Sequence, residues 1–517
     1  MSDRLRRVLA RLATPVVLSG ALIAGSGVPI AQAGAESTYL VVYNSKALPA
    51  GATDTIRRAN GTMVAAYPEI GVAIARSNNL AFSKEVKNDS NVAGVSATKG
   101  FGTRLKKGDP AEAAKSAETV EQGDTPSLTA RQWDMRQINA FAAQEVTRGS
   151  RRVLVGDIDT GLDFTHPNLK RNVDFANSVS CIGGKANTSP AAWMDDNGHG
   201  THTAGTIAAG SMEGGILGVA PNVRIAAIKA GDADGFFFPE AVICAFMWAG
   251  RHHMDVTNNS YFADPWLYNC LNNSGQKAIY DAEARAINFA MGKGVTVVAA
   301  AGNENDDLGN PTFDNLSPDF PLNTNVTRTV DKNCFVSPAM VPGVYTVSAT
   351  GQLNMKSFYS SYGMPWVQAA APGGDSRQKT TAMPDGRVLS TYPAALIPDL
   401  LASGFNPNRV FKVCDEDGGA CGFYVTFQGT SMASPHVAGV AALIASRFGH
   451  QDAETMTQLL NAATNQIPCP ANPYGTYPGP DGKPAHCSGT LAYNSFYGHG
   501  QIDALKAVTE SSDQNNE

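Results

Sequence analysis

Between residues 152 and 300, short apolar segments alternate with helical patterns, and this alternation restricts the fold more than any other feature of the chain. The predicted strands lie at 152–158, 223–229, 255–260 and 295–300. The predicted helices between them lie at 200–209, 239–249 and 282–291. Strands that alternate with helices form parallel sheets covered by helices on both faces. The sequence therefore predicts an α/β fold with a doubly wound, mostly parallel sheet.

Other segments flank or interrupt this pattern. A small α+β unit precedes it, with predicted strands at 39–43, 63–67, 72–75 and 92–95 and predicted helices at 53–59 and 80–87. Residues 375–427 are expected to form a long, loop-rich insertion. We divide the chain into a signal peptide (1–33), an α+β domain (34–107), an exposed linker (108–128), a main domain (129–510) and a disordered tail (511–517).

The N-terminus has the pattern of an export signal. Four arginines between residues 4 and 11 precede a mostly apolar stretch, Leu12–Ile30, and an A-x-A cleavage site at Ala31–Ala33. The alternative is a membrane anchor, but five glycines and prolines interrupt a stretch barely long enough to span a bilayer. We therefore expect a secreted, extracellular protein that is not bound to a membrane once the signal is removed.

Composition narrows the function further. The formal net charge is −6 and no long basic run occurs, so nucleic acid is not an expected partner. The chain has eight cysteines, an even number that favours disulfides in an exported protein. Their spacing suggests the pairs Cys414–Cys421 and Cys469–Cys487, with Cys181–Cys244 and Cys270–Cys334 for the remainder.

Four segments carry residues that could act together in catalysis by a serine. Asp159 follows a strand in V-G-D-I-D-T-G, where a carboxylate can orient a histidine; the alternative is an ordinary turn aspartate. His199 begins a helix of small residues in D-N-G-H-G-T-H and suits a general base. Metal binding with His202 is the alternative, but no H-E-x-x-H glutamate is present. Ser431, in G-T-S-M-A-S-P, precedes an apolar helix and could otherwise be an N-cap. Asn303 ends a strand of small residues, where its amide can donate to an oxyanion.

Together these segments resemble the subtilisin-like serine peptidases, or subtilases, over about residues 129–508. The G-T-S-M-A-S-P and H-G-T-H motifs are highly specific, and the chain order Asp, His, Ser also agrees. The resemblance implies a serine endopeptidase that works through an acyl-enzyme on protein or peptide substrates. Asp159 would orient, His199 would be the base and acid, and Ser431 would be the nucleophile.

The resemblance also implies the remaining site residues. Asn303 and the Ser431 backbone N–H would form the oxyanion hole. Ser260, Tyr261 and Gly302 would bind an extended substrate. The small and apolar residues at 299–302 and 260–262 predict an apolar or aromatic residue before the cut, although Glu304 could attract a basic one instead.

Some positions depart from the subtilase pattern. Asp157 occupies a strand position that is usually apolar and shares a face with Asp159; it either perturbs the triad or is a structural, hydrogen-bonded carboxylate. Asn168 stands where the family often has a calcium-binding aspartate, and Met212 replaces an oxygen ligand in the adjoining 210–216 loop. The chemistry needs no cofactor and we assign no metal ligands; calcium would be a structural ion at a site that the sequence does not identify.

The N-terminal unit, about residues 38–97, resembles the inhibitory propeptide of the same family. The enzyme, expected to be a monomer, would cut itself free of this propeptide between about Ala97 and Pro126. The residues near 101–107 would enter the cleft as substrate does. The alternative is an accessory domain that the mature protein keeps. Two other functions compete with the endopeptidase: a peptide-binding pseudoenzyme, and an esterase, although G-x-S-x-G is absent around Ser431.

Overall fold

The computed structural model describes residues 36–98, 127–210, 212–263, 266–319, 325–381, 384–415, 418–471 and 484–509. The predicted export signal, most of the predicted linker and the predicted tail lie outside these residues. Leu128, which the sequence assigns to the end of the linker, is fully buried in the core of the main domain.

A nine-stranded sheet forms the centre of the main domain. All neighbouring strands are parallel except β19 and β20, which confirms the mostly parallel sheet that the sequence predicts. The strands follow one another across the sheet in the order β19 (Thr464–Asn465), β20 (Gln501–Ile502), β15 (Val367–Pro372), β14 (Tyr345–Thr350), β10 (Thr296–Ala300), β8 (Val256–Asn259), β5 (Leu154–Asp159), β7 (Arg224–Lys229) and β6 (Val179–Ser180).

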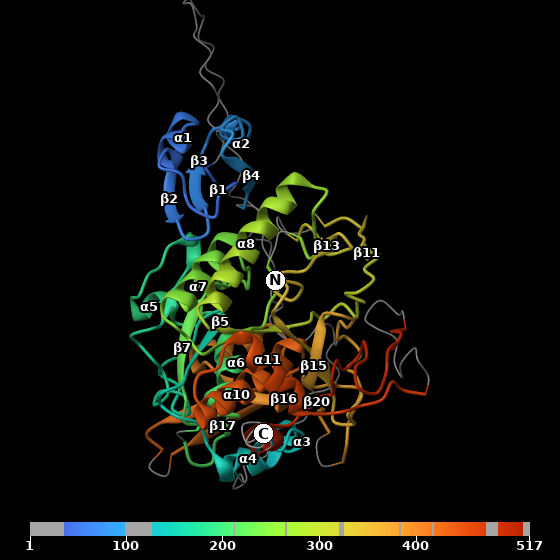
Figure 1. The fold of residues 1–517 in the computed structure, drawn as a ribbon. Coiled ribbons are helices and arrows are strands. Elements are labelled where there is room, and N and C mark those ends of the chain that lie inside the picture. Colours follow the sequence, from blue (N-terminus) through green and yellow to red (C-terminus); the bar gives the residue numbers. More distant parts are fainter. Residues whose placement is uncertain are drawn as a thin grey trace, which may run out of the picture.

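Helices cover both faces of this sheet, and the alternation of side chains along β5 shows how (Figure 1). Leu154 and Ile158 pack in one apolar cluster with α7 (Pro239–Arg251) and α8 (Ser274–Gly292). Val155 packs in the other, with α6 (His199–Ala208) and α10 (Thr430–Phe448). Successive strand residues point to opposite faces, so Asp157 and Asp159 share the α6 and α10 side with Val155. Two acidic side chains are thereby placed beneath the N-terminus of α6.

The segment 375–427 is not the loop-rich insertion that we expected from the sequence. It contains a three-stranded antiparallel sheet, ordered β16 (Val388–Tyr392), β18 (Cys421–Phe427), β17 (Val410–Cys414). Its polar side chains hold α6: the Ser390 hydroxyl donates to the His202 carbonyl at 2.7 Å and Thr391 to the Thr201 carbonyl at 2.6 Å. The glycines and polar residues that suggested loops lie between strands rich in β-branched and aromatic residues.

The N-terminal unit forms a separate small domain with its own antiparallel sheet, ordered β2 (Gly61–Tyr67), β3 (Val72–Ser77), β1 (Ser37–Tyr43), β4 (Val92–Ala97), and the helices α1 (Ala52–Arg58) and α2 (Phe82–Val86). Leu40, Val42 and Ile74 share an apolar cluster with residues of α7 and α8. Figure 1 shows the domain, in blue, beside α8. Its sheet therefore packs on the outer face of the helix pair.

Shorter elements complete the described chain. They are η1 (Leu128–Arg131), α3 (Trp133–Gln137), α4 (Ala140–Val146), η2 (Ile182–Gly184), α5 (Pro190–Trp193), β9 (Asn269–Cys270), β11 (Phe313–Asp314), β12 (Arg328–Thr329), β13 (Cys334–Phe335), η3 (Ala394–Leu396), α9 (Ile397–Ala402), η4 (Pro407–Arg409), α11 (Ala453–Ala462) and α12 (Ala504–Thr509). Among the described helices, none combines the length and the apolar character that crossing a membrane would require.

Four disulfides close the main domain, and they are the four pairs that the cysteine spacing suggested. The structure joins Cys181 to Cys244, Cys270 to Cys334, Cys414 to Cys421, and Cys469 to Cys487. The first two bridges span 63 and 64 residues of sequence, and the third spans only 7. A bridge across a longer segment removes more conformational freedom from the unfolded chain.

We expect this difference in loop length to appear as a difference in stability. Replacing Cys270 and Cys334 by serine should cost about 4 kcal/mol in the chain-entropy treatment, against about 2.5 kcal/mol for Cys414 and Cys421. The measurement is denaturant unfolding of the two double variants beside the parent chain. Equal losses, or a larger loss for the short loop, would contradict the entropic origin of this stability.

Candidate active site

The candidate site lies where three neighbouring strands of the parallel sheet end. Asp159 ends β5, Ser260 follows β8, and Asn303 follows β10 after the short turn Ala301–Gly302. These strands are adjacent in the order β10, β8, β5, so their carboxyl ends meet at one edge of the sheet. Ser431 reaches the same edge from the first turn of α10. Residues far apart in sequence are thus brought together by strand order.

Asp159 and His199 form a close pair. His199 Nδ1 lies 2.8 Å from Asp159 Oδ1 and 3.0 Å from Oδ2, and the carboxylate is fully buried. A hydrogen on Nδ1 directed at the carboxylate leaves Nε2 free to accept a proton. The helix that carries His199 approaches the strand end closely: a Cβ on Gly200 would come within 2.1 Å of the Gly161 carbonyl oxygen. Only glycine permits this approach.

Asp195 organises the loop before His199, and our sequence analysis did not identify it. Its Oδ1 accepts from the Thr160 hydroxyl at 2.9 Å and from the Gly198 N–H at 2.9 Å. Its Oδ2 accepts from the Thr201 N–H at 2.9 Å, in the first turn of α6. A carboxylate at a helix N-terminus is a favourable arrangement, and this one fixes His199 relative to Asp159. The sequence signal that could have identified this role is an aspartate shortly before a predicted helix.

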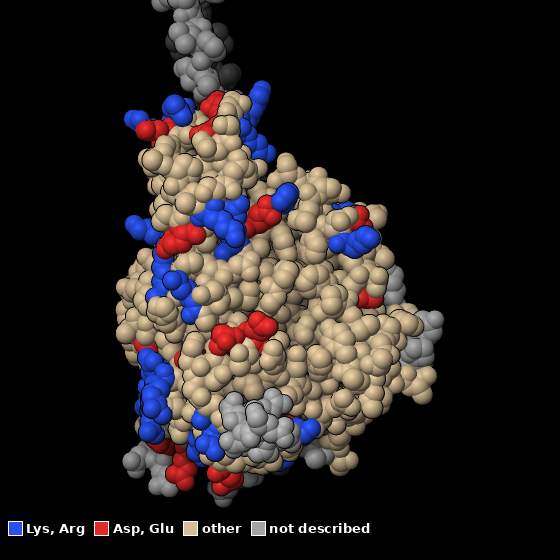
Figure 2. Space-filling view, viewed as in Figure 1, with Lys and Arg blue, Asp and Glu red and all other residues tan. Residues whose placement is uncertain are grey.

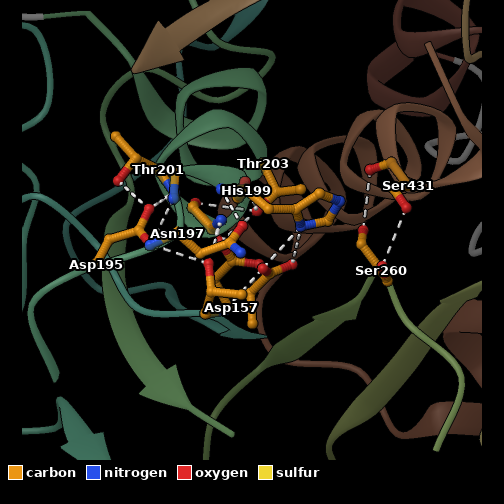
Figure 3. Close-up of polar contacts among 12 residues, drawn as sticks. Asp157, Asp195, Asn197, His199, Thr201, Thr203, Ser260 and Ser431 are labelled. Atoms are coloured by element: carbon orange, nitrogen blue, oxygen red, sulfur yellow. Dashed lines mark hydrogen bonds and ion pairs between the residues drawn. The ribbon is translucent and has the colours of Figure 1, made fainter. Parts of the chain in front are cut away.

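Ser431 hydrogen bonds to the strand end rather than to the histidine. Its hydroxyl donates to the Ser260 carbonyl at 3.0 Å, and the Ser260 hydroxyl donates back to the Ser431 carbonyl at 2.9 Å. Figure 3 shows His199 on the side of its helix that faces Ser431 and Ser260. Among the described residues no hydrogen bond joins His199 to Ser431. A proton transfer from this serine to His199 would require the hydroxyl to turn away from the Ser260 carbonyl and toward the imidazole.

Asn303 is held against the first turn of α10 by its amide oxygen. Its Oδ1 accepts from the Thr430 N–H at 2.9 Å and from the Thr430 hydroxyl at 3.0 Å. A backbone N–H can only donate, so the accepting atom must be the amide oxygen. The space beside Gly429 is bordered by the Ser431 nitrogen, 3.6 Å from where a Cβ would stand, and by the Asn303 side chain, 3.7 Å from it. Thr430, to which we gave no role from sequence, orients the asparagine.

The three predicted substrate-binding residues occupy the same edge. Ser260 is fully buried and bonded to Ser431 as described. Tyr261 stacks on Phe237 with ring centroids 4.2 Å apart, and its hydroxyl donates to Asn259 Oδ1 at 3.2 Å. The Gly302 N–H donates to the Thr430 hydroxyl at 3.2 Å, and that hydroxyl in turn donates to the Asn303 amide oxygen.

The two positions considered for metal ligands have structural partners. His202 is fully buried, stacks on Phe427 and has its Nε2 3.2 Å from the Val425 carbonyl; burial lowers its pKa to about 3. Asn168 uses both ends of its amide on the loop that follows α6, donating to the Ile216 carbonyl and accepting from the Met212 N–H at 3.0 Å each. Hydrogen bonds from Asn168 thus organise this loop.

The geometry defines a serine hydrolase site on a parallel α/β sheet, and comparison with known proteins agrees. The profile of the Subtilase family, Peptidase_S8, matches residues 150–500. This chain belongs to the subtilase family. It is 31% identical to subtilisin DY of Bacillus licheniformis over 315 residues, which are 60% of this chain and 84% of the relative. It is 30% identical to the thermophilic serine proteinase of Bacillus sp. strain AK1, covering 71% of this chain and 64% of the relative.

Solved structures of other proteins share this fold over most of the chain. The epidermin leader peptide processing serine protease of Staphylococcus aureus superimposes with a TM-score of 0.65 at 23% identity, covering 92% of this chain and 99% of that one. Fervidolysin from Fervidobacterium pennivorans superimposes with a TM-score of 0.59 at 22% identity, covering 92% of this chain and 61% of that one. The protein is a subtilisin-like serine peptidase that acts on protein or peptide substrates, and members of this family need no cofactor for the chemistry.

Proposed function

We propose that Asp159, His199 and Ser431 are the catalytic triad and that Asn303 completes the oxyanion hole. The observation that carries this assignment is the 2.8 Å pair between His199 and the fully buried Asp159 carboxylate, on the same sheet edge as the Ser431 hydroxyl. Asp159 holds the imidazole in the tautomer whose Nε2 accepts a proton. The two bonds from Thr430 occupy the Asn303 amide oxygen, which leaves its amide nitrogen to donate to a substrate oxygen.

The geometry supports the following sequence of steps. A substrate carbonyl enters beside Ser431, and the serine hydroxyl turns from the Ser260 carbonyl toward His199. Nε2 takes the proton as Oγ attacks the carbonyl carbon, and Asp159 stabilises the imidazolium. The Asn303 amide and the Ser431 N–H stabilise the negative oxygen. His199 gives its proton to the leaving amine, and water then hydrolyses the acyl-enzyme by the same route.

We further propose that the protein is a secreted zymogen and that its N-terminal domain is an inhibitory propeptide. The domain is tied to the peptidase by specific contacts: Arg251 pairs with Glu69 through two hydrogen bonds of 2.9 Å, and Arg285 donates to the Tyr43 carbonyl at 2.8 Å. Figure 2 shows side chains of both signs gathered along this junction. Four disulfides and the sequence of the N-terminus support export.

A close contact offers a test of inhibition by this domain. A Cβ on Gly94 would lie 2.8 Å from the Ala278 Cβ of α8, whereas a Cβ on Gly51 meets nothing within 4 Å. Gly94→Val should loosen the domain and shorten the lag before activity appears after secretion, while Gly51→Val should leave the lag unchanged. The measurement is hydrolysis of a peptide substrate against time in the two secreted variants. An unchanged lag in Gly94→Val would argue against inhibition through this interface.

Self-processing is tested separately. The Ser431→Ala precursor should be secreted with its N-terminal domain still attached, when produced in a host without other extracellular peptidases. Sequencing the N-terminus of the secreted protein shows whether the domain has been removed. An inactive variant that carries the wild-type mature terminus would show that another enzyme makes the cut, and would leave the peptidase assignment intact.

We also propose that the enzyme prefers an apolar or aromatic residue before the cut. The residues at 299–302 that would border the substrate are small, and Tyr261, which follows Ser260, is fixed by stacking on the buried ring of Phe237. Glu304 has its Oε2 2.7 Å from the Asn303 N–H, a contact that holds one carboxylate oxygen to the backbone. Cleavage of a peptide library is the test, and a profile dominated by acidic residues at this position would contradict the proposal.

A further inference from the structure

Asp157 is a second buried carboxyl group beside the triad. It lies on β5 two residues before Asp159, on the same face of the sheet and roughly 6–7 Å away. Both side chains are shielded from solvent, with Asp157 1% exposed and Asp159 0% exposed. Asp157 Oδ1 accepts from Asn258 Nδ2 at 2.8 Å, and Oδ2 lies 2.8 Å from Thr203 Oγ1. Figure 3 shows Asp157 in the middle of the contacts beneath His199.

The groups that face Asp157 do not provide a positive charge for it. Asp159 shares its strand, Thr203 faces it from α6, and Asn258 faces it from β8. Asp195, in the loop before α6, adds a second nearby acid. Lys229, on β7, does not pair with Asp157. Its ammonium group bonds to Asp196 Oδ1 at 2.6 Å and to the Thr160 carbonyl. His199 bonds to Asp159.

Two carboxylates this close in a buried site do not both ionise readily. Asp159 has the imidazole of His199 to stabilise its charge, so the proton belongs on Asp157. Burial, followed by the negative charge of Asp159, raises the pKa of Asp157 well above its usual value, against the opposing effect of its bonds with Asn258 and Thr203.

Hydrogen-bond directions locate this proton on Oδ2. The Ser260 hydroxyl donates its one hydrogen to the Ser431 carbonyl at 2.9 Å and therefore accepts from Asn258 Nδ2 at 3.0 Å. This orients the Asn258 amide, whose Nδ2 also donates to Asp157 Oδ1, so that oxygen is an acceptor. Oδ2 can then donate to Thr203 Oγ1, because the Thr203 hydroxyl has another acceptor, the Gly200 carbonyl at 3.0 Å.

We propose that Asp157 is a positioning residue that, as a neutral carboxylic acid, connects the two halves of the active site. Through Thr203 it holds the first turn of α6, which carries His199. Through Asn258 it holds Ser260 and, by the Ser260 hydroxyl, the first turn of α10, which carries Ser431. Asn258 Oδ1 also accepts from Ser434 on α10 at 2.7 Å. This role rests on the triad proposed above.

The proton on Asp157 is tested by stability, in the full-length Ser431→Ala chain. A carboxyl whose folded pKa is raised contributes stability that is fully present below its unfolded pKa of about 3.9. That stability is lost as the pH rises through the folded pKa. Asparagine cannot ionise and reproduces the acid, because its oxygen accepts from Asn258 and its nitrogen donates to Thr203. Asp157→Asn should therefore raise Tm by roughly 2–4 °C at pH 8 and by progressively less toward pH 4.

Asp314→Asn is the matched control. Asp314 is equally buried but bonds to the Arg328 guanidinium at 2.7 Å, so its carboxylate has a cation that asparagine would leave unpaired. This control should lower Tm at pH 8. A fall in Tm at pH 8 for Asp157→Asn as well would show that Asp157 is an anion and would overturn the proposal.

The positioning role is tested by activity in the wild-type chain. Asp157→Val leaves Asn258 and Thr203 without their shared partner, and kcat should fall on the order of 10²-fold with KM changed less than about threefold. Asp157→Asn should restore most of that kcat. An Asn variant as impaired as the Val variant, or a Val variant with unchanged kcat, would refute positioning by a neutral acid. If the triad assignment itself is wrong, Ser431→Ala will remain active. The comparison of Tm between Asp157→Asn and Asp314→Asn would still show whether Asp157 carries the proton.

Discussion

Replacing Ser431 with alanine should abolish peptide hydrolysis, with kcat falling on the order of 10⁶-fold, the size of loss observed in the related subtilisin. In the proposed mechanism, the hydroxyl oxygen of Ser431 is the atom that bonds to the carbonyl carbon of the substrate. The fold should survive, because the main-chain oxygen of residue 431 still accepts from the Ser260 hydroxyl. The measurement is kcat and KM on a peptide substrate with purified protein, alongside circular dichroism and Tm.

Ser446→Ala is the control for this substitution. Ser446 lies on the same helix, and its hydroxyl donates to the Ala442 carbonyl at 2.6 Å and accepts from the Ser150 N–H at 3.0 Å, outside the candidate site. It should retain wild-type kcat even if Tm falls. Labelling by a serine-directed phosphonate adds a second readout: wild type should react at Ser431 and Ser431→Ala should not. An unlabelled wild-type protein with no activity would favour the peptide-binding pseudoenzyme.

The central sheet and the four catalytic candidates could be predicted because their signals are local. The apolar strands are long enough to recognise; Asp159 ends one of them, and Ser260 and Asn303 each follow another. Parallel strands bring such residues to one edge, so a pattern in the sequence predicts a place in space. The start of α8 was missed because its first turns are polar: the helix begins at Ser274, where the Asn273 side chain accepts from two backbone N–H groups.

The parts that sequence could not predict depend on partners distant in the chain. Thr430 orients Asn303 across 127 residues, and Asn258 bonds to Asp157 across 101. Neither pairing leaves a periodic or compositional trace near the residue concerned. Asp157 illustrates the limit: the alternation of a strand places it on the face of Asp159, but only the contacts of Asn258 and Thr203 indicate where its proton lies.

Asn303→Ala should lower kcat by roughly 10²–10³-fold while leaving KM nearly unchanged, a magnitude again taken from subtilisin. In the proposed mechanism, the amide donates to an oxygen whose charge develops only as Ser431 attacks. Its loss should therefore raise the energy of the transition state and not that of the bound substrate. The fold should be retained, since Thr430 keeps its backbone place in the first turn of α10.

Two further variants separate this effect from a general disturbance of the loop. Asn303→Asp keeps the oxygen that accepts from Thr430 but replaces the donor with a negative group, so kcat should fall at least as far as in the alanine variant. Asn310→Ala, at an exposed asparagine further along the same loop, should have wild-type kinetics. Steady-state kcat and KM for the three variants are the measurement. Activity of Asn303→Ala within about twofold of wild type would mean that the oxyanion is stabilised by the Ser431 N–H without Asn303.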